Sequence, residues 1–159
     1  MRYDLKLIVL SISLMFAFTS SNLLAARTSS QESRRPSVAP EFKAGQKAVN
    51  AKDYKSAVTY LSKALEKDPN NADTHNLLGY SYRKLGNTNK AFEHYQIALR
   101  INPKHRGANE YLGELYLETG QLGKAEERLA VLDQACPWGC EEYDDLKEAV
   151  ERYKAENKQ

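Results

Sequence analysis

The two cysteines of the chain, Cys136 and Cys140, enclose a Pro-Trp-Gly tripeptide in the stretch CPWGC. Two thiols this close could perform redox exchange, hold a soft metal ion such as copper(I), or form a structural disulfide. Redox sites of the thioredoxin type place two residues between the cysteines, at a helix start in a strand-helix fold, whereas three residues intervene here. A copper site would lack a third Cys, Met or His nearby in the sequence. The fold and the compartment have to decide between these uses.

The other reactive side chains show no catalytic pattern. The three histidines, His75, His94 and His105, have no metal-like spacing with one another or with a cysteine, and no Ser-His-Asp arrangement or Gly-rich phosphate loop is visible. Acidic residues crowd positions 141–145, but a calcium loop would place its carboxylates at alternate positions around a Gly turn. We expect these acids to favour a helix N-terminus instead. The sequence therefore predicts no enzyme activity, no metal and no cofactor.

The N-terminal segment has the order of a secretory signal peptide. Arg2 and Lys6 precede an almost wholly apolar run, residues 7–18, and small residues follow it. A retained membrane anchor is the alternative. Spanning the hydrocarbon takes about 20 apolar residues, however, and the run would then have to include the polar residues 19–22.

Export of the chain bears on the cysteines. We expect residues 1–26 to be cleaved after Ala25 or Ala26, which leaves no membrane span and makes the protein periplasmic or secreted in a bacterium. No cysteine stands directly after the apolar run, which excludes a lipoprotein anchor. Because exported compartments are oxidising, a disulfide between Cys136 and Cys140 is favoured.

Charge is balanced in sum but uneven along the chain. Beyond residue 26 there are 21 basic and 20 acidic residues, a balance that gives no case for nucleic acid. Residues 38–105 hold 11 Lys and Arg against 6 acids, whereas residues 106–159 hold 7 against 13. This asymmetry suggests weak head-to-tail self-association, in which the basic half of one molecule meets the acidic half of another.

Similar residues recur every 34 positions after a segment, residues 27–40, that has no apolar period and is expected to be a flexible linker. Each unit is expected to form two helices, because apolar residues recur at intervals of three and four and a Gly-Asn or Asn-Pro pair ends each run. Gly79 and Ala91 are expected to let the two helices approach closely. The recurring columns are Ala44-Gly45, Leu78-Gly79 and Leu112-Gly113; Ala57, Ala91 and Ala125; Leu61, Tyr95 and Leu129; and Pro69, Pro103 and Pro137.

One unit is the fullest match to a known repeat. The run NLLGYSYRKLGNTNKAFEHYQIALRINP, Asn76 to Pro103, closely resembles a tetratricopeptide repeat, whose signature is Leu-Gly and Tyr on a first helix, then Ala, an aromatic residue, Ala and Pro on a second. The resemblance implies an all-α fold: a right-handed α-solenoid of three helix-turn-helix repeats with a C-terminal capping helix. The three repeats would occupy 38–139, as 38–71, 72–105 and 106–139, and the capping helix would lie in 140–159.

The repeat register favours the structural use of the cysteines. Pro137 stands in the proline column, at the turn where one repeat ends and the next element begins. A disulfide between Cys136 and Cys140 would join the final repeat to the capping helix, and closing a ring of about five residues contributes about 2 kcal/mol. Trp138 is expected to cover the adjoining apolar face. Thiol or copper handling by the cysteine pair stays open as the alternative function.

The resemblance also implies what the fold is for. In tetratricopeptide arrays the first helices line a concave groove, so we expect a non-catalytic adaptor or scaffold of the bacterial cell envelope that binds an extended peptide or protein surface there. The positions that match the groove are Phe42, Gln46, Asn50, Asn76, Tyr80, Arg83, Lys84, Glu110, Glu114, Leu117 and Glu118.

Three groove positions on the second repeat suggest what is bound. Asn76, Tyr80 and Arg83 fall at spacings of four and three and share one helix face. An amide, a phenol and a guanidinium together suit a peptide backbone or a carboxylate. The clamp that some members of the family use for C-terminal carboxylates is not expected, because the third repeat carries Glu110 and Glu114 where basic residues are needed.

Overall fold

Helices form every regular element of residues 39–157, the part of the chain that this computed structural model describes. The predicted signal peptide, residues 1–26, lies outside the described residues, as does the predicted linker up to residue 38. Pro40, the last linker residue, instead begins a helix, where proline is favoured because the first helical N–H needs no partner. None of the helices in this region is long and apolar enough to cross a membrane. The helices are α1 Pro40–Asn50, α2 Tyr54–Lys67, α3 Ala72–Lys84, α4 Thr88–Ile101, α5 Arg106–Glu118, α6 Leu122–Ala135 and α7 Glu141–Glu156.

The turns inside the helix pairs repeat with the same 34-residue period. Lys52, Gly86 and Gly120 all adopt left-handed backbone conformations, with φ of 59°, 76° and 75°. Glycine reaches this region without steric cost, which explains two of the three residues. Asp53 and Asn87 then cap the following helices, because their side chains accept a hydrogen bond from the backbone N–H three residues further on. Only the reversal between α3 and α4 has both a glycine at the left-handed position and a capping side chain, Gly86 and Asn87.

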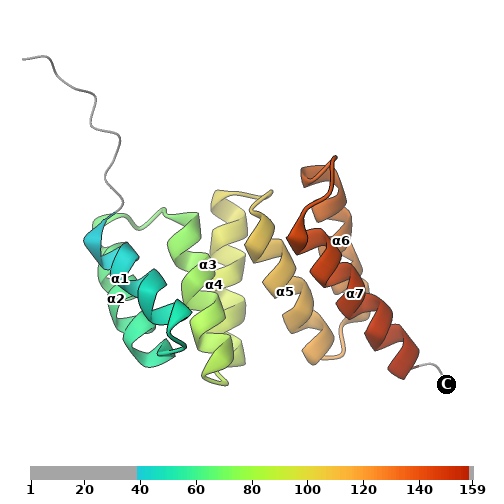
Figure 1. The fold of residues 1–159 in the computed structure, drawn as a ribbon, viewed down its shortest axis with the longest axis horizontal. Helices are drawn as coiled ribbons and strands as arrows, with labels where there is room; N and C mark the ends of the chain where they lie inside the picture. Colours follow the sequence, from blue (N-terminus) through green and yellow to red (C-terminus); the bar gives the residue numbers. More distant parts are fainter. Residues whose placement is uncertain (1–38, 158–159) are drawn as a thin grey trace, which may run out of the picture. The chain divides into compact units, whose positions relative to one another are not determined.

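The helices stack in chain order, from blue to red in Figure 1. Neighbours α1 and α2, α3 and α4, and α5 and α6 form hairpins. Direct contacts also join α1 to α3, α3 to α5 and α5 to α7, whereas α2, α4 and α6 make none with one another within residues 39–157. The surface formed by α1, α3, α5 and α7 is thus the inner side of the stack, and we call it the inner face. The predicted all-α solenoid of helix-turn-helix units is confirmed.

Small residues set the spacing inside the first two hairpins. Gly79 of α3 faces Tyr95 of α4 so closely that an added Cβ atom would lie 2.6 Å from the tyrosine ring. Gly45 of α1 stands in the same relation to Leu61 of α2. Ala91 of α4, the other small residue expected between α3 and α4, is fully buried. The helix axes can approach this far only because these positions carry little or no side chain.

The third hairpin departs from this pattern. An added Cβ atom at Gly113 of α5 would lie 2.5 Å from Leu146 of α7, instead of meeting a residue of its own hairpin. Leu129 of α6, which stands in the column of the other two partners, is only partly buried. Leu146 is fully buried and packs with Leu132 and Val150 in a cluster that α5, α6 and α7 build together. The last helix therefore lies directly on α5.

Candidate functional site

A polar cavity of about 520 Å³ lies on the inner face, where α3, α5 and α7 meet. Asn76 of α3, Glu110 and Tyr111 of α5 and Asp145 of α7 are among the residues that line it. Asn76 and Glu110 are positions that the sequence assigns to the groove, and they come from different repeats. The fold therefore brings two of the expected groove residues together around one hollow, which we call the polar cavity.

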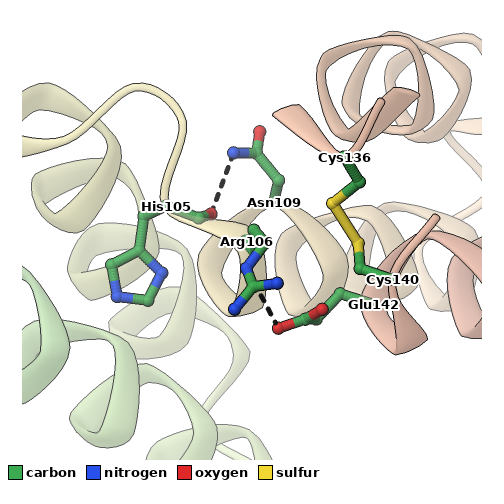
Figure 2. Close-up of a disulfide and its surroundings, with 6 residues drawn as sticks. All are labelled: His105, Arg106, Asn109, Cys136, Cys140 and Glu142. Carbon is green, nitrogen blue, oxygen red and sulfur yellow. Dashed lines mark hydrogen bonds and ion pairs between the residues drawn. A yellow bond between two sulfur atoms is a disulfide. The ribbon is translucent and has the colours of Figure 1, made fainter. Parts of the chain in front are cut away.

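An ion pair and a hydrogen bond bound the polar cavity. Arg106 Nε of α5 lies 3.6 Å from Glu142 Oε1 of α7, and Figure 2 shows this pair next to the disulfide. His105 Nε2 lies 2.9 Å from Asp73 Oδ1. The Nδ1 atom of His105 accepts a hydrogen bond from the backbone N–H of Ala108 at 3.1 Å and caps α5. Since Nδ1 accepts, Nε2 carries the ring proton that is donated to Asp73.

Glu110 is the most unusual group in the polar cavity. Its exposed fraction is only 7%, yet it forms no hydrogen bond or ion pair within residues 39–157. Burial raises the pKa of its carboxyl to about 8, and the nearby acids Glu114, Asp145 and Glu142 add to the effect. A carboxyl in this setting is held partly neutral at physiological pH.

Asn76 is buried beside Glu110, with an exposed fraction of 8%. Its amide lies over Gly107 of α5, where an added Cβ atom would come within 3.0 Å of Nδ2. The Oδ1 atom is fully buried and has no hydrogen-bond partner. Buried amide groups are rarely left unpaired in proteins, so hydrogen-bonding capacity is held in reserve here.

Arg83 of α3 joins the second and third repeats through a partly exposed ion-pair cluster. Its guanidinium binds Glu114 and Glu118 of α5, with Nε donating to Glu118 Oε1 at 3.1 Å, and its side chain is 10% exposed. Burial alone would lower the pKa of Arg83, but the hydrogen bonds to the two carboxylates outweigh burial and raise it. These residues line a second, smaller cavity of about 240 Å³, which α7 closes with Tyr153. Arg83 is therefore committed to its own chain rather than free for a ligand carboxylate.

Aromatic rings connect α3 and α5 along the inner face. The ring centroids of Tyr80 and Tyr111 are 5.0 Å apart, and Tyr54 packs edge-on against Tyr80 at 6.0 Å. Lys84 Nζ lies 5.1 Å from the centroid of the Tyr80 ring. Burial raises the pKa of Tyr111 to about 12, so its phenol stays neutral. Tyr111 also lines the polar cavity, and the strip of rings therefore leads into it.

The predicted groove residues on α3 and α5 fall into three sets. Asn76 and Glu110 line the polar cavity, and Arg83, Glu114, Leu117 and Glu118 line the smaller one. Tyr80 and Lys84 pack together beside these cavities. The predicted positions on α1 belong to none of these sets. Phe42 packs against the apolar core between α1, α2 and α3, while Gln46 and Asn50 are exposed and line neither cavity.

Sequence reasoning missed the contribution of α7 to the cavities. Extending the 34-residue column of Asn76 and Glu110 would place Asp144 in the polar cavity, but Glu141, Glu142 and Asp145 line it instead. The acids of 141–145 do begin α7 as expected, and several of them also face the polar cavity. The 141–145 cluster was the one signal that could have drawn attention to them.

The disulfide joins the end of α6 to the start of α7. The sulfurs of Cys136 and Cys140 are bonded, with Cα atoms 5.7 Å apart, and Figure 2 shows the bridge beside Glu142. The five-residue ring thus holds the first turn of α7 in place next to the polar cavity. Copper binding would require both thiols to be reduced. No cluster of three or more potential metal ligands is found in residues 39–157.

The expectation for Trp138 is wrong. Its side chain is 97% exposed, so it covers no apolar face. Gly139 next to it adopts a left-handed conformation, with φ of 85°, which glycine reaches without steric cost. Leu146 and Val150 of α7, rather than the tryptophan, complete the core at this end.

Two histidines meet inside the second hairpin, which their spacing in the sequence did not suggest. The Nδ1 atoms of His75 and His94 lie 3.0 Å apart, and the His94 ring stacks on Tyr82. His75 Nε2 lies 3.1 Å from the carbonyl oxygen of Pro69. Since that oxygen only accepts, Nε2 of His75 is protonated and its Nδ1 accepts from His94 when both rings are neutral. This pair is a structural contact between α3 and α4.

Comparison with known families gives matches over the first two hairpins. The model of the tetratricopeptide repeat matches residues 72–105, and a second model, described as TPR repeat, matches residues 49–86. The Arabidopsis thaliana protein CTR9 homolog is 34% identical over 82 residues, which is 52% of this chain and 8% of that protein. Small glutamine-rich tetratricopeptide repeat-containing protein 2 of Mycosarcoma maydis is 30% identical over 83 residues, 52% of this chain and 24% of that protein. The chain thus spans less than a quarter of the length of either relative.

Solved structures share the fold over most of the chain. The tetratricopeptide domain of Sgt2 from Aspergillus fumigatus has a TM-score of 0.65 and 24% identity, covering 73% of this chain and 76% of its own. The first such domain of Spaghetti (RPAP3), bound to an HSP90 peptide, scores 0.62 at 18% identity over 70% and 89% of the two chains. The Yersinia enterocolitica chaperone SycD, in complex with a peptide of the translocator YopD, scores 0.64 at 16% identity over 74% and 92%. Models of the tetratricopeptide repeat therefore match residues 49–105, and the chain shares the fold of solved tetratricopeptide domains over about three quarters of its length.

Proposed function

We propose that this chain is a non-catalytic interaction module that binds an extended peptide or a protein surface along the inner face of α3, α5 and α7. The observation that carries the proposal is the polar cavity, which holds two polar side chains, Asn76 and Glu110, that are buried and unpartnered within residues 39–157. Unpaired polar groups at a cavity are poised to bond a ligand, since leaving them unsatisfied costs free energy. The tyrosine strip beside them offers flat apolar contact area.

The likeness to solved neighbours supports a peptide as the partner. RPAP3 and SycD have this fold and were solved with peptides bound. The ion pairs of the inner face also fit an adaptor role, because Arg83 is already paired with Glu114 and Glu118 and is not free to bind a ligand carboxylate. The proposal is therefore for recognition of a chain segment, and not for capture of a free C-terminal carboxylate.

We also propose that the protein is exported to the bacterial cell envelope or beyond. The basic start, the apolar run and the small residues up to position 26 support export, and a cysteine pair bridged at an α6–α7 turn suits an oxidising compartment. The mass and N-terminal residue of the protein recovered from its native host test this directly. A product that starts after Ala25 or Ala26 is expected, and a full-length product in the cytosol would refute export.

Self-association through the uneven charge is a separate proposal. The basic residues 38–105 of one molecule would meet the acidic residues 106–159 of another. Sedimentation at low and high salt tests this contact, because exposed charges are screened by salt. A monomer at low salt would remove the idea.

Replacement of Tyr80 tests binding along the inner face. We expect Tyr80→Ala to reduce capture of partner peptides from a peptide array, because the substitution removes the ring between Tyr54 and Tyr111. Tyr60→Ala is the matched control, since Tyr60 is a 41% exposed tyrosine on α2, outside the inner face. Circular dichroism of both variants confirms that the fold is kept. Equal capture by the wild type and Tyr80→Ala would refute binding at this surface.

A further inference from the structure

Charge inside the polar cavity is unbalanced toward the acids. Arg106 neutralises one of its carboxylates, Glu142, whereas the neutral His105 ring donates a hydrogen bond to Asp73 without cancelling its charge. The rest of the lining has more negative than positive groups. The carboxylates of the lining whose side chains have neither a hydrogen-bond nor an ion-pair partner within residues 39–157 are Glu110, Glu141 and Asp145, against one such cation, Lys104.

Glu110 points to the cavity as the place where this imbalance is resolved. Its side chain is more than nine-tenths buried and has no partner in the described residues, yet its oxygens are not among the fully buried atoms that lack a hydrogen bond. They are therefore reached from the polar cavity, which Glu110 lines. A buried acid of this kind costs free energy in the ionised form unless a positive group is supplied.

We propose that the polar cavity receives the side chain of a lysine or arginine of the bound partner, with Glu110 as its counter-charge. This inference rests on the proposed function, since it assigns one residue of the segment that the inner face binds. Glu141 and Asp145 of α7 add to the negative field, and the Tyr111 ring offers a face for a cation. Asn76 can donate from Nδ2 to a carbonyl oxygen of the same segment, since Nδ2, unlike Oδ1, is not fully buried.

A side-chain cation fits this chemistry better than a metal ion. No three metal-ligating groups come together within residues 39–157. The hollow of about 520 Å³ is far larger than a bare ion needs and has room for an alkyl chain that ends in an ammonium or a guanidinium. One carboxylate flanked by an amide and an aromatic ring pairs with such a group through directional hydrogen bonds.

Binding should be coupled to a proton. Glu110 has a pKa of about 8 in the free protein, and a bound cation favours its ionised form. The complex at pH 7 therefore forms with release of a proton, and affinity weakens as the pH falls below 8. The other titratable or charged groups at this cavity and beside Glu110 are Asp73 of α3; Lys104 and His105 of the α4–α5 turn; Arg106, Tyr111 and Glu114 of α5; and Glu141, Glu142 and Asp145 of α7.

A pair of small probes tests the cavity directly. Nα-acetyl-lysine N-methylamide carries the proposed cation, and Nα-acetyl-norleucine N-methylamide has the same shape without the charge. We expect the isotope-labelled full chain to bind the lysine probe with a dissociation constant on the order of millimolar, with NMR shifts centred on Glu110 and Asn76. The norleucine probe should bind at least tenfold more weakly.

Charge-matched variants assign the effect to one carboxylate. Glu110→Gln should weaken lysine-probe binding at least tenfold and abolish proton release on binding at pH 7. Glu151→Gln removes the same charge from α7 at an exposed position outside the polar cavity and should leave both unchanged. Equal binding of the two probes, or wild-type affinity in Glu110→Gln, would overturn the cation site.

The outcome also separates this inference from the proposed function. If Tyr80→Ala abolishes peptide capture while Glu110→Gln and the wild type select peptides with the same frequency of lysine and arginine, the inner face binds peptides and the cation site is wrong. If the lysine probe binds in a Glu110-dependent way but Tyr80→Ala captures peptides normally, the cation site stands and the binding surface proposed along the tyrosines is wrong.

Discussion

Glu110→Gln should make the folded protein more stable, and increasingly so as the pH rises. The carboxyl has a pKa of about 8 in the folded chain, against 4.5 for an ordinary glutamate. The folded state therefore holds this proton more tightly than the unfolded state does. The stability that Glu110 contributes as a neutral acid is fully present below pH 4.5 and is lost as the pH rises through 8. Glutamine has no proton to lose and escapes this penalty.

The magnitude follows from the shift in pKa. Each unit corresponds to about 1.4 kcal/mol, so a carboxyl that moves from 4.5 to about 8 on folding costs about 5 kcal/mol above pH 8 and about 3 kcal/mol at pH 7. Water in the polar cavity solvates the ionised form and reduces these figures. We therefore expect Glu110→Gln to raise the free energy of unfolding by about 2 kcal/mol at pH 7, and by close to nothing at pH 4.5.

Urea unfolding followed by circular dichroism at half-unit steps from pH 4.5 to pH 8.5 measures this difference. Glu151→Gln is the control for removal of a negative charge, because Glu151 is exposed on α7. Its stability should run parallel to that of the wild type. A gap between Glu110→Gln and wild type that stays constant across this range would refute the raised pKa and the reasoning built on it.

Three further results are expected. Gly79→Ala should destabilise the fold by about 1 to 3 kcal/mol through overlap with the ring it faces, whereas Gly123→Ala, with nothing within 4 Å of the added Cβ, should stabilise it by up to about 1 kcal/mol; thermal unfolding of both decides this. Burial and the neighbouring His75 lower the pKa of His94, so the contribution of His94 to stability should drop as the pH falls below 6.5, and His94→Gln should gain stability relative to the wild type between pH 7 and pH 5 in urea titrations. Replacement of Cys136 and Cys140 by Ser should cost about 2 kcal/mol under oxidising conditions and nothing in reductant, measured by the same titrations.

The parts of the fold that local chemistry encodes could be predicted from the sequence. The 34-residue columns fix where Gly79 meets Tyr95, because small and large residues at matching positions allow only one close packing of the two helices. Glycines in left-handed conformations and side chains that cap helix N-termini likewise mark turns in the sequence. The inner-face positions of α3 and α5 followed from the resemblance to the tetratricopeptide repeat, and Asn76 and Glu110 do lie together at the polar cavity.

The contribution of α7 could not be predicted in this way. Its packing depends on which apolar residue fills the space over Gly113: Leu129 stands in the column of Leu61 and Tyr95, but Leu146 from outside the repeats occupies this space. The raised pKa of Glu110 could not be predicted from the sequence either. The pKa of Glu110 depends mainly on burial, then on Glu114 one helical turn away and on acids of α7 that are more than 30 residues away; only Glu114 is visible in the residues around it. The prediction for Trp138 was wrong because the tight ring leaves it no surface to reach.

Trp138 has a practical consequence for every experiment that uses fluorescence. It is the single tryptophan of the chain and is 97% exposed when folded, so its emission already reports an aqueous environment. Unfolding should change that emission little, and a flat fluorescence curve in denaturant would be a property of the reporter and not a sign of an unfolded chain. The same exposure makes the indole sensitive to any surface that settles on the CPWGC ring. The fluorescence of Trp138 should therefore report binding at the CPWGC ring and should not report unfolding of the chain.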